Sequence, residues 1–269
     1  MTIDPSAPDQ VHTVVREKYG AIAEGRTAGC CGDSCGCGGG TTTVSAAALG
    51  YSATDTAALP EGADLGLGCG APTAHADIHP GDVVLDLGSG AGIDVFVAAR
   101  ATGPTGRVIG VDMTPAMLER ARHNAAKAGV GNVEFRLGEI EHLPVADASV
   151  DAVISNCVIN LSPDKPAVFR EAFRALRPGG RLAVSDLVLS RPLPEEARRS
   201  ADLWCGCVAG ASLEAEYLDA IRAAGFERVE VVRRSSYGAL AEDRPAGAME
   251  REALDAVVSL QVKAVRPLG

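Results

Sequence analysis

The eight cysteines of this sequence are the residues best suited to unusual chemistry. Four lie together in a glycine-rich stretch: Cys30, Cys31, Cys35 and Cys37. The others are Cys69, Cys157, Cys205 and Cys207. The first ten residues are polar, and no stretch approaches the ~20 apolar residues of a membrane helix. We therefore expect a cytoplasmic protein, whose cysteines bind an ion or take part in catalysis rather than form a disulfide framework.

A second chemical feature is a glycine-rich turn of GxGxG form at residues 84–92, VLDLGSGAG. The dinucleotide fingerprint GxGxxG would place its third glycine one residue later, where the chain has Ile93. Asp86 lies just before the glycines, and its carboxylate can anchor the turn or meet an ammonium group. Asp112 follows the turn by about 20 residues, at the end of the next apolar run, where an acid can bind both hydroxyls of a ribose.

Apolar runs alternate with helical patterns from residue 82 onward. Strands are predicted over 82–88, 107–113, 132–140, 149–160, 181–189 and 227–234. Helices are predicted over 92–102, 114–129, 165–180 (closed by Gly179) and 214–226. Continuous apolar strands separated by helices indicate a parallel sheet covered on both faces. The alternating run 256–266 adds an antiparallel strand, so the expected fold is α/β with a doubly wound, mostly parallel sheet.

Four segments are expected along the chain. Residues 1–65 form an N-terminal arm with a helix over 11–24, the cysteine- and glycine-rich loop, and a short helix within 45–60 near a capping Ser52. Residues 66–190 hold the glycine turn, 191–213 form an inserted substrate segment, and 214–269 complete the sheet. A formal net charge of −10 disfavours nucleic acid and anionic membranes as partners.

The glycine turn, Asp112 and the acids at 139–141 resemble class I S-adenosylmethionine-dependent methyltransferases over about residues 75–190 and the tail. The resemblance implies a Rossmann-like fold and S-adenosylmethionine as methyl donor. It also implies that Asp112 holds the ribose and that Asn156 closes the site after the fourth strand. The other residues that it places around this ligand, together with Asp86, are Gly88, Ser89, Gly90, Met113, Ile140 and Glu141.

Three cysteines are placed to meet near such a donor. Cys157 follows the fourth strand at the edge of the sheet where substrates bind. Cys69 lies in GLGCGAP, a turn expected to leave its sulfur accessible, and the segment with Cys207 can fold over the same edge. Three thiolates suit a soft ion. Zinc prefers four ligands in a closed site, whereas trivalent arsenic takes three and keeps a nucleophilic lone pair.

Longer segments, LGYSATDTAALPEGADLGLGCG, SNCVINLSPDK and CVAGA, resemble arsenite methyltransferases over nearly the whole chain. The resemblance implies that Cys69, Cys157 and Cys207 bind arsenic and that a fourth, redox-active cysteine falls on Cys31. Ala71 stands where many relatives have asparagine, and Cys205 lies outside the shared pattern.

We hypothesise a cycle in which arsenite exchanges from small thiols onto Cys157 and Cys207, then Cys69. The arsenic lone pair would then displace the methyl group in line. Enzyme thiols would reduce the product, and a thiol reductant, glutathione or thioredoxin, would reset them. The expected partners are trivalent arsenicals and thioredoxin, with neither nucleic acid nor membrane.

Three alternatives stay open from the sequence. The chain could methylate a small organic metabolite, with Asp186 or Asp202 as base. It could instead bind metalloids without catalysis, as a buffer or sensor. Independently of these, the four loop cysteines could hold a zinc ion.

Overall fold

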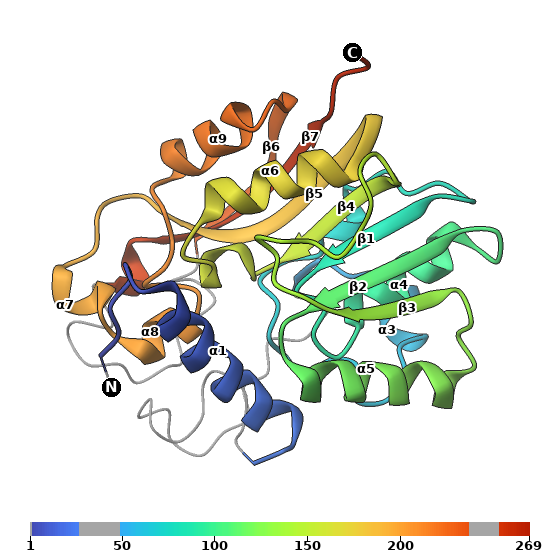
Figure 1. Ribbon diagram of the computed structural model, residues 1–269, viewed down its shortest axis with the longest axis horizontal. Coiled ribbons are helices and arrows are strands. Elements are labelled where there is room, and N and C mark those ends of the chain that lie inside the picture. The colour runs from blue at the N-terminus through green and yellow to red at the C-terminus, as the bar shows by residue number, and fades with distance from the viewer. Residues whose placement is uncertain (1, 27–48, 237–252) are drawn as a thin grey trace.

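A computed structural model describes residues 2–26, 49–236 and 253–269. The described part of the chain contains one sheet of seven strands, in the order β3-β2-β1-β4-β5-β7-β6 (Figure 1). The strands are β1 Val83–Leu87, β2 Arg107–Asp112, β3 Val133–Leu137, β4 Val150–Asn156, β5 Leu176–Leu189, β6 Glu227–Ser236 and β7 Val257–Val265. Neighbouring strands pair in parallel from β3 through β5, and β7 is antiparallel to both β5 and β6. The predicted fold class is confirmed.

Most helices lie in the segments where helical patterns were found. The helices are α1 Pro8–Ala23, α3 Ala53–Ala57, α4 Ile93–Thr102, α5 Pro115–Ala128, α6 Lys165–Ala175, α7 Glu195–Arg198, α8 Ala201–Cys205 and α9 Glu214–Ala223, with 3₁₀ turns η2 Pro72–Ala74 and η3 Ile159–Leu161. Of these, α7 and α8 lie in the inserted segment 191–213, for which no helix was predicted. Ser52 caps α3 through a capping box with Asp55. Among the described residues, no helix has the length and apolar character needed to span a membrane.

Several predicted boundaries are wrong. The strand predicted over 149–160 ends at Asn156 and is followed by the turn η3, and the helix predicted over 214–226 ends at Ala223. The helix predicted over 165–180 ends at Ala175, and β5 begins at Leu176. Pro178 explains this early end, because a residue that precedes proline is disfavoured in the helical conformation. The strand predicted over 132–140 ends at Leu137, so the acids at 139–141 lie in the turn that follows.

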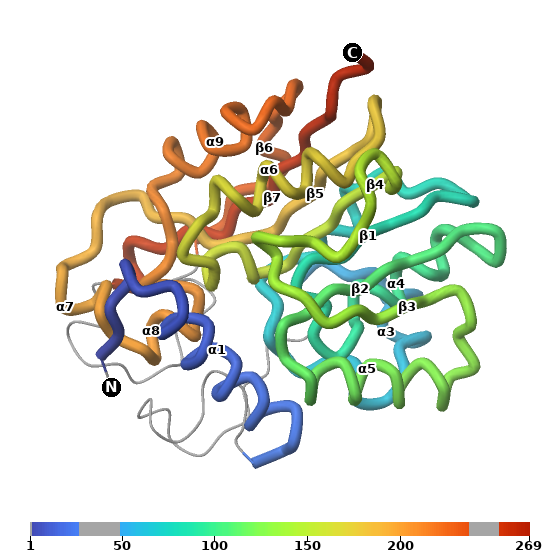
Figure 2. Tube along the Cα trace, viewed as in Figure 1, coloured from blue at the N-terminus to red at the C-terminus, as the bar shows by residue number. Residues whose placement is uncertain are grey.

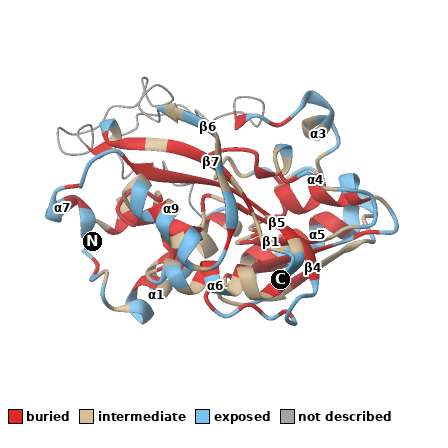
Figure 3. Cartoon of the chain, turned by 90° about the horizontal axis from the view of Figure 1, so that it is seen from above, coloured by how far each residue is buried: buried red, intermediate tan, exposed pale blue. Residues whose placement is uncertain are grey.

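Helices cover both faces of the sheet (Figures 2 and 3). On one face α4 and α5 pack against Val84 and Ile154. On the other α6 and α9 pack against Leu85 and Val153, their neighbours in the strands. This alternation follows from the two-residue repeat of a strand, and burial on both faces explains why the central strands are apolar throughout.

A third apolar cluster covers the carboxyl edge of the sheet, beside the two main cores. It joins Val11 and Val15 of α1 to Trp204 of α8 and to the cysteines of the 201–207 segment. Figure 1 shows α1 lying beside α8, and the Tyr19 hydroxyl donates to the Cys205 carbonyl oxygen at 3.1 Å. The N-terminal helix and the inserted segment therefore form one cover over this edge.

Candidate active site

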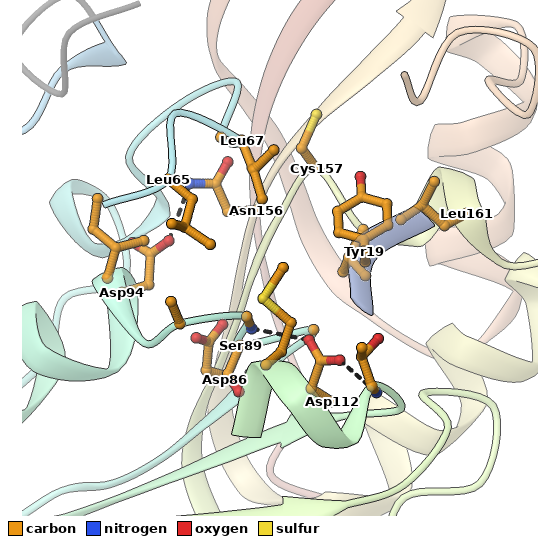
Figure 4. A pocket seen from close by; sticks show the side chains of 18 of the residues that line it. Tyr19, Leu65, Leu67, Asp86, Ser89, Asp94, Asp112, Asn156, Cys157 and Leu161 are labelled. Carbon is orange, nitrogen blue, oxygen red and sulfur yellow. Dashed lines mark hydrogen bonds between the residues drawn. The ribbon is translucent and has the colours of Figure 1, made fainter. Parts of the chain in front are cut away.

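A large pocket opens at the carboxyl edge of β1, β2 and β4 (Figure 4). It encloses about 1040 Å³ of space, open solvent included, which is ample for a nucleoside-sized ligand. All nine residues predicted to contact the methyl donor line it: Asp86, Gly88, Ser89, Gly90, Asp112, Met113, Ile140, Glu141 and Asn156. Cys157 lines it as well. The structure thus brings together one arsenic-binding candidate and the whole predicted cofactor set.

The glycine turn forms the floor of the pocket. Gly88 has φ +66°, and a Cβ there would lie 2.3 Å from Val158 Cγ2, so no larger residue fits. The Asp112 carboxylate accepts hydrogen bonds from the backbone N–H of Gly90 at 2.9 Å and of Thr114 at 2.8 Å. Burial raises the pKa of Asp112, and these two bonds oppose the rise.

The donor atoms of this floor fit a polar ligand. Each Asp112 oxygen accepts one backbone hydrogen bond and keeps a lone pair for a ribose hydroxyl. The Ser89 hydroxyl is buried and has no hydrogen-bond partner among the described residues. A buried polar atom of this kind needs a partner, which a bound ligand can supply.

The far end of the pocket is built by a residue that the sequence interpretation missed, His12. Its Nε2 lies 3.1 Å from Glu141 Oε1, and its Nδ1 lies 3.4 Å from Glu139 Oε1. The hydrogen bond with Glu141 raises the pKa of His12. Ser162 donates to the same Glu141 carboxylate. The only sequence signal was the i, i+3, i+7 spacing of His12, Val15 and Tyr19, which places them on one helical face.

Asn156 connects the pocket to Cys69. Its Nδ2 donates to Asp94 Oδ2 at 3.0 Å, to the Tyr51 hydroxyl at 3.0 Å and to the Gly70 carbonyl at 2.7 Å. Its Oδ1 accepts the backbone N–H of Cys69 at 3.1 Å. Tyr51 and Asp94, which also line the pocket, were not predicted from the sequence. Through this amide, the position of Cys69 is tied to the lining of the cofactor pocket.

The three cysteines predicted to bind arsenic meet beside β5. The sulfurs of Cys69 and Cys157 and a carboxylate oxygen of Asp186 lie within 4.8 Å of one another. The thiol of Cys207 lies outside that cluster but contacts Cys157, donating to its carbonyl oxygen. The prediction that Cys69 is accessible is wrong, since it is 5% exposed. Ser259 of β7 donates to its carbonyl, and the next residue, Gly70, packs tightly on Ser185.

Burial and mutual contact keep these thiols protonated. Burial raises the pKa of Cys69 to about 11. Contact with Cys157 and then burial raise the pKa of Cys207 well above its usual value. The hydrogen bond from Cys207 lowers the pKa of Cys157, but contact with Cys69 together with burial outweighs it. Neutral thiols must therefore lose their protons as a soft ion binds.

A buried acid, Asp186, and a half-buried base, Lys165, stand next to the cysteines. Burial raises the pKa of Asp186 to about 7 and lowers the pKa of Lys165 to about 8, and each group opposes the shift of the other. By contrast Asp202, the other acid considered as a base, is exposed on α8 and does not line the pocket.

The four loop cysteines, Cys31 included, lie outside the described residues.

Comparison with known proteins agrees with this geometry. Residues 78–225 match the methyltransferase domain family. The chain is 48% identical to an arsenite methyltransferase of Halobacterium salinarum over 97% of this chain and 68% of that protein. It is 46% identical to an arsenite methyltransferase of Aquipseudomonas alcaligenes over 53% of this chain, but spans only 43% of that relative.

A solved structure gives the same result. The arsenic(III) S-adenosylmethionine methyltransferase of Chlamydomonas reinhardtii aligns with a TM-score of 0.59 at 37% identity, covering 74% of this chain and 67% of that one. The chain therefore belongs to the methyltransferase family, and within it to the arsenite methyltransferases.

Proposed function

We propose that this chain transfers methyl groups from S-adenosylmethionine to trivalent arsenic held by Cys69, Cys157 and Cys207. The observation that carries the proposal is the position of Cys157. This residue lines the pocket that contains the whole predicted cofactor set and also contacts the other two cysteines. A thiolate-bound ion and a methyl donor would therefore face each other across Cys157.

The pocket residues have distinct parts in holding the donor. Asp112 would bind the ribose, because both its oxygens are fixed by backbone N–H groups and keep free lone pairs. The turn that contains Ser89 would cradle the methionine part, with Asp86 and Asn156 beside it. Met113, Ile140 and Glu141 would surround the adenine. S-adenosylmethionine, when bound, supplies an electrophilic methyl group on a sulfonium.

The cysteines would present arsenic as the nucleophile. Each thiol replaces one arsenic substituent, and its proton leaves with the displaced hydroxide or small thiolate, so the buried site stays neutral. The arsenic lone pair carries no proton, so methyl transfer needs no general base. Catalysis is then chiefly the positioning of two reactants, an effect that supplies roughly 7–11 kcal/mol in favourable cases.

A thiol reductant completes the proposed cycle. Methyl transfer leaves arsenic formally pentavalent, and two cysteine thiolates would return it to the trivalent state by forming a disulfide. Cys31 is the proposed loop partner in that disulfide, and glutathione or thioredoxin would reduce it. Such a cycle needs a reducing compartment such as the cytoplasm, where Cys69, Cys157 and Cys207 stay reduced between turnovers.

The test is incubation of the protein with arsenite, glutathione and S-adenosylmethionine labelled in the methyl group, followed by chromatography of the products. We expect label in methylarsenicals. Label that appears only in an organic metabolite would indicate a different acceptor. Cofactor binding without turnover on arsenite would indicate a metalloid-binding protein that does not catalyse methylation.

A further inference from the structure

Asp186 is a buried acid that the proposed cycle does not use. It lies on β5 and is 1% exposed. Its neighbour Ser185 presents a carbonyl oxygen to the backbone N–H of Cys157 at 2.8 Å and to the Cys69 sulfur at 3.6 Å. One Asp186 oxygen lies within 4.8 Å of the sulfurs of both Cys69 and Cys157. A carboxylate is thus built into the wall of the arsenic site.

Three donors hold this carboxylate in place. Asn160 Nδ2 and the Leu187 N–H donate to Oδ1 at 2.8 and 2.9 Å, and the Tyr217 hydroxyl donates to Oδ2 at 3.1 Å. Hydrogen bonds donated to a carboxylate favour its charged form. The Lys165 ammonium lies near enough to favour that form too. The fold therefore maintains an acceptor at a point where burial alone would oppose a negative charge.

The reaction places a positive charge beside this acceptor. The arsenic lone pair forms the As–C bond while the C–S bond of the sulfonium breaks, and the electron pair of that bond stays on sulfur. The sulfonium charge is thereby lost, and arsenic, oxidised from the trivalent to the pentavalent state, becomes positive. The negative field of Asp186 acts on all three cysteine sulfurs, and the same field favours a cation at the atom that they bind.

We propose that the Asp186 carboxylate stabilises the positive charge that develops on arsenic during methyl transfer, and is a further catalytic group of this site. The inference rests on the proposed function. A fixed charge directed at the atom where charge develops acts on the transition state more than on the bound substrate. The expected result of its removal is therefore a slower chemical step with little change in arsenite binding.

The test is Asp186→Asn, which removes the charge and keeps the shape. The amide oxygen retains the bonds from Asn160 and Leu187, and the Tyr217 hydroxyl can turn to accept from the new amide N–H. In a single turnover the methylation rate should fall about 100- to 1000-fold. Arsenite affinity, followed by the fluorescence of Trp204, and S-adenosylmethionine affinity should each stay within about threefold.

Tyr217→Phe is the matched control, because it removes one hydrogen bond from Asp186 and keeps the carboxyl group itself. It should slow methylation far less than Asp186→Asn does. Asp186→Glu, which keeps the charge, should be faster than Asp186→Asn. If the amide variant does not fold, Asp186→Ser is the second neutral variant and carries the same expectation.

Three results would overturn the inference. The first is an unchanged single-turnover rate in the neutral variants. The second is an equal loss of rate and arsenite affinity in those variants, and the third is an equal loss of rate in Tyr217→Phe. Either of the last two would indicate that Asp186 only supports Asn160 and Tyr217 structurally. Failure of the proposed function differs from these, because the unmodified protein would then bind arsenite without methylating it, and the inference would fall with it.

Discussion

The thiol of Cys207 donates to the backbone carbonyl oxygen of Cys157 across 2.8 Å, although fifty positions separate the two residues. Both have left-handed backbones, with φ 61° and 56° respectively. This conformation costs on the order of 1–3 kcal/mol for a residue with a side chain, and persists where the surrounding fold enforces it. The two thiols are therefore placed together by the protein before any metalloid binds.

Replacement of either residue by serine should remove this pair as ligands. We expect Cys157→Ser and Cys207→Ser each to abolish methylation of every arsenical, because a hydroxyl is too hard for a soft metalloid. The melting temperature should change little, since serine is nearly the same size. Cys205→Ser, at a buried cysteine outside the proposed site, is the control and should keep activity. Wild-type turnover by either site variant would disprove the three-thiolate site.

Cys69 should differ from this pair. A monomethylated arsenical has two positions left for thiolates, so Cys157 and Cys207 suffice to hold it. We expect Cys69→Ser and Cys31→Ser to suppress methylation of arsenite but to leave methylarsonous acid as a substrate. The measurement is product chromatography with each substrate. Stoichiometric zinc in the purified protein, or an equal loss on both substrates, would favour a zinc site in the loop and contradict this division.

Asp112→Ala should weaken S-adenosylmethionine binding by about 1–3 kcal/mol, the range for lost hydrogen bonds to a charged group. Isothermal titration calorimetry measures this directly. Arsenite binding should survive, because the cysteines lie on other elements. An unchanged affinity for S-adenosylmethionine would remove Asp112 from the ribose-binding role.

The pair of His12 and Glu141 should make stability depend on pH. The pKa of His12 is raised above its ordinary value of 6.5, chiefly by the hydrogen bond with Glu141, with Glu139 adding to the rise and Arg16 opposing it. Protonated His12 therefore stabilises the fold fully below pH 6.5, the ordinary pKa, and this stabilisation is lost as the pH rises through the raised pKa. The pKa of Glu141 is lowered, so the stabilisation from its ionised form is lost only as the pH falls below 4.5, the ordinary pKa of a glutamate.

His12→Gln removes the titrating group and serves as the reference. The melting temperature of the unmodified protein should exceed that of the variant at ~pH 6, and the difference should shrink toward ~pH 9. Differential scanning calorimetry across this range tests the expectation. A difference that is independent of pH would show that His12 contributes through packing alone.

The fold and the floor of the pocket could be predicted because their signals are local. The alternation of strands and helices follows from periodicity, and a GxGxG turn followed by Asp112 carries its function within a short stretch. The contact between Cys69 and Cys157 joins distant parts of the chain. The position of Cys157 at the end of the fourth strand predicted it and the resemblance to arsenite methyltransferases sharpened it, whereas periodicity alone would not have given it.

The parts that sequence interpretation missed depend on tertiary packing. Tyr51 and Asp94 line the pocket because Asn156 draws both toward the end of β4. The backbone carbonyl of the buried Cys69 accepts a hydrogen bond from Ser259, far away in the chain. No local pattern records such distant partners, and a glycine-rich turn is ordinarily exposed.

The place of β7 in the sheet sets an order for folding during synthesis. β6 leaves the ribosome before β7, yet its only pairing among the described strands is with β7, which lies between β6 and β5. A nascent chain that ends before Val257 therefore has an unpaired edge on β5 and an unattached β6, both open to wrong pairing. It also lacks Ser259, which holds the Cys69 carbonyl. The proposed metalloid site is thus among the last parts of the protein to form.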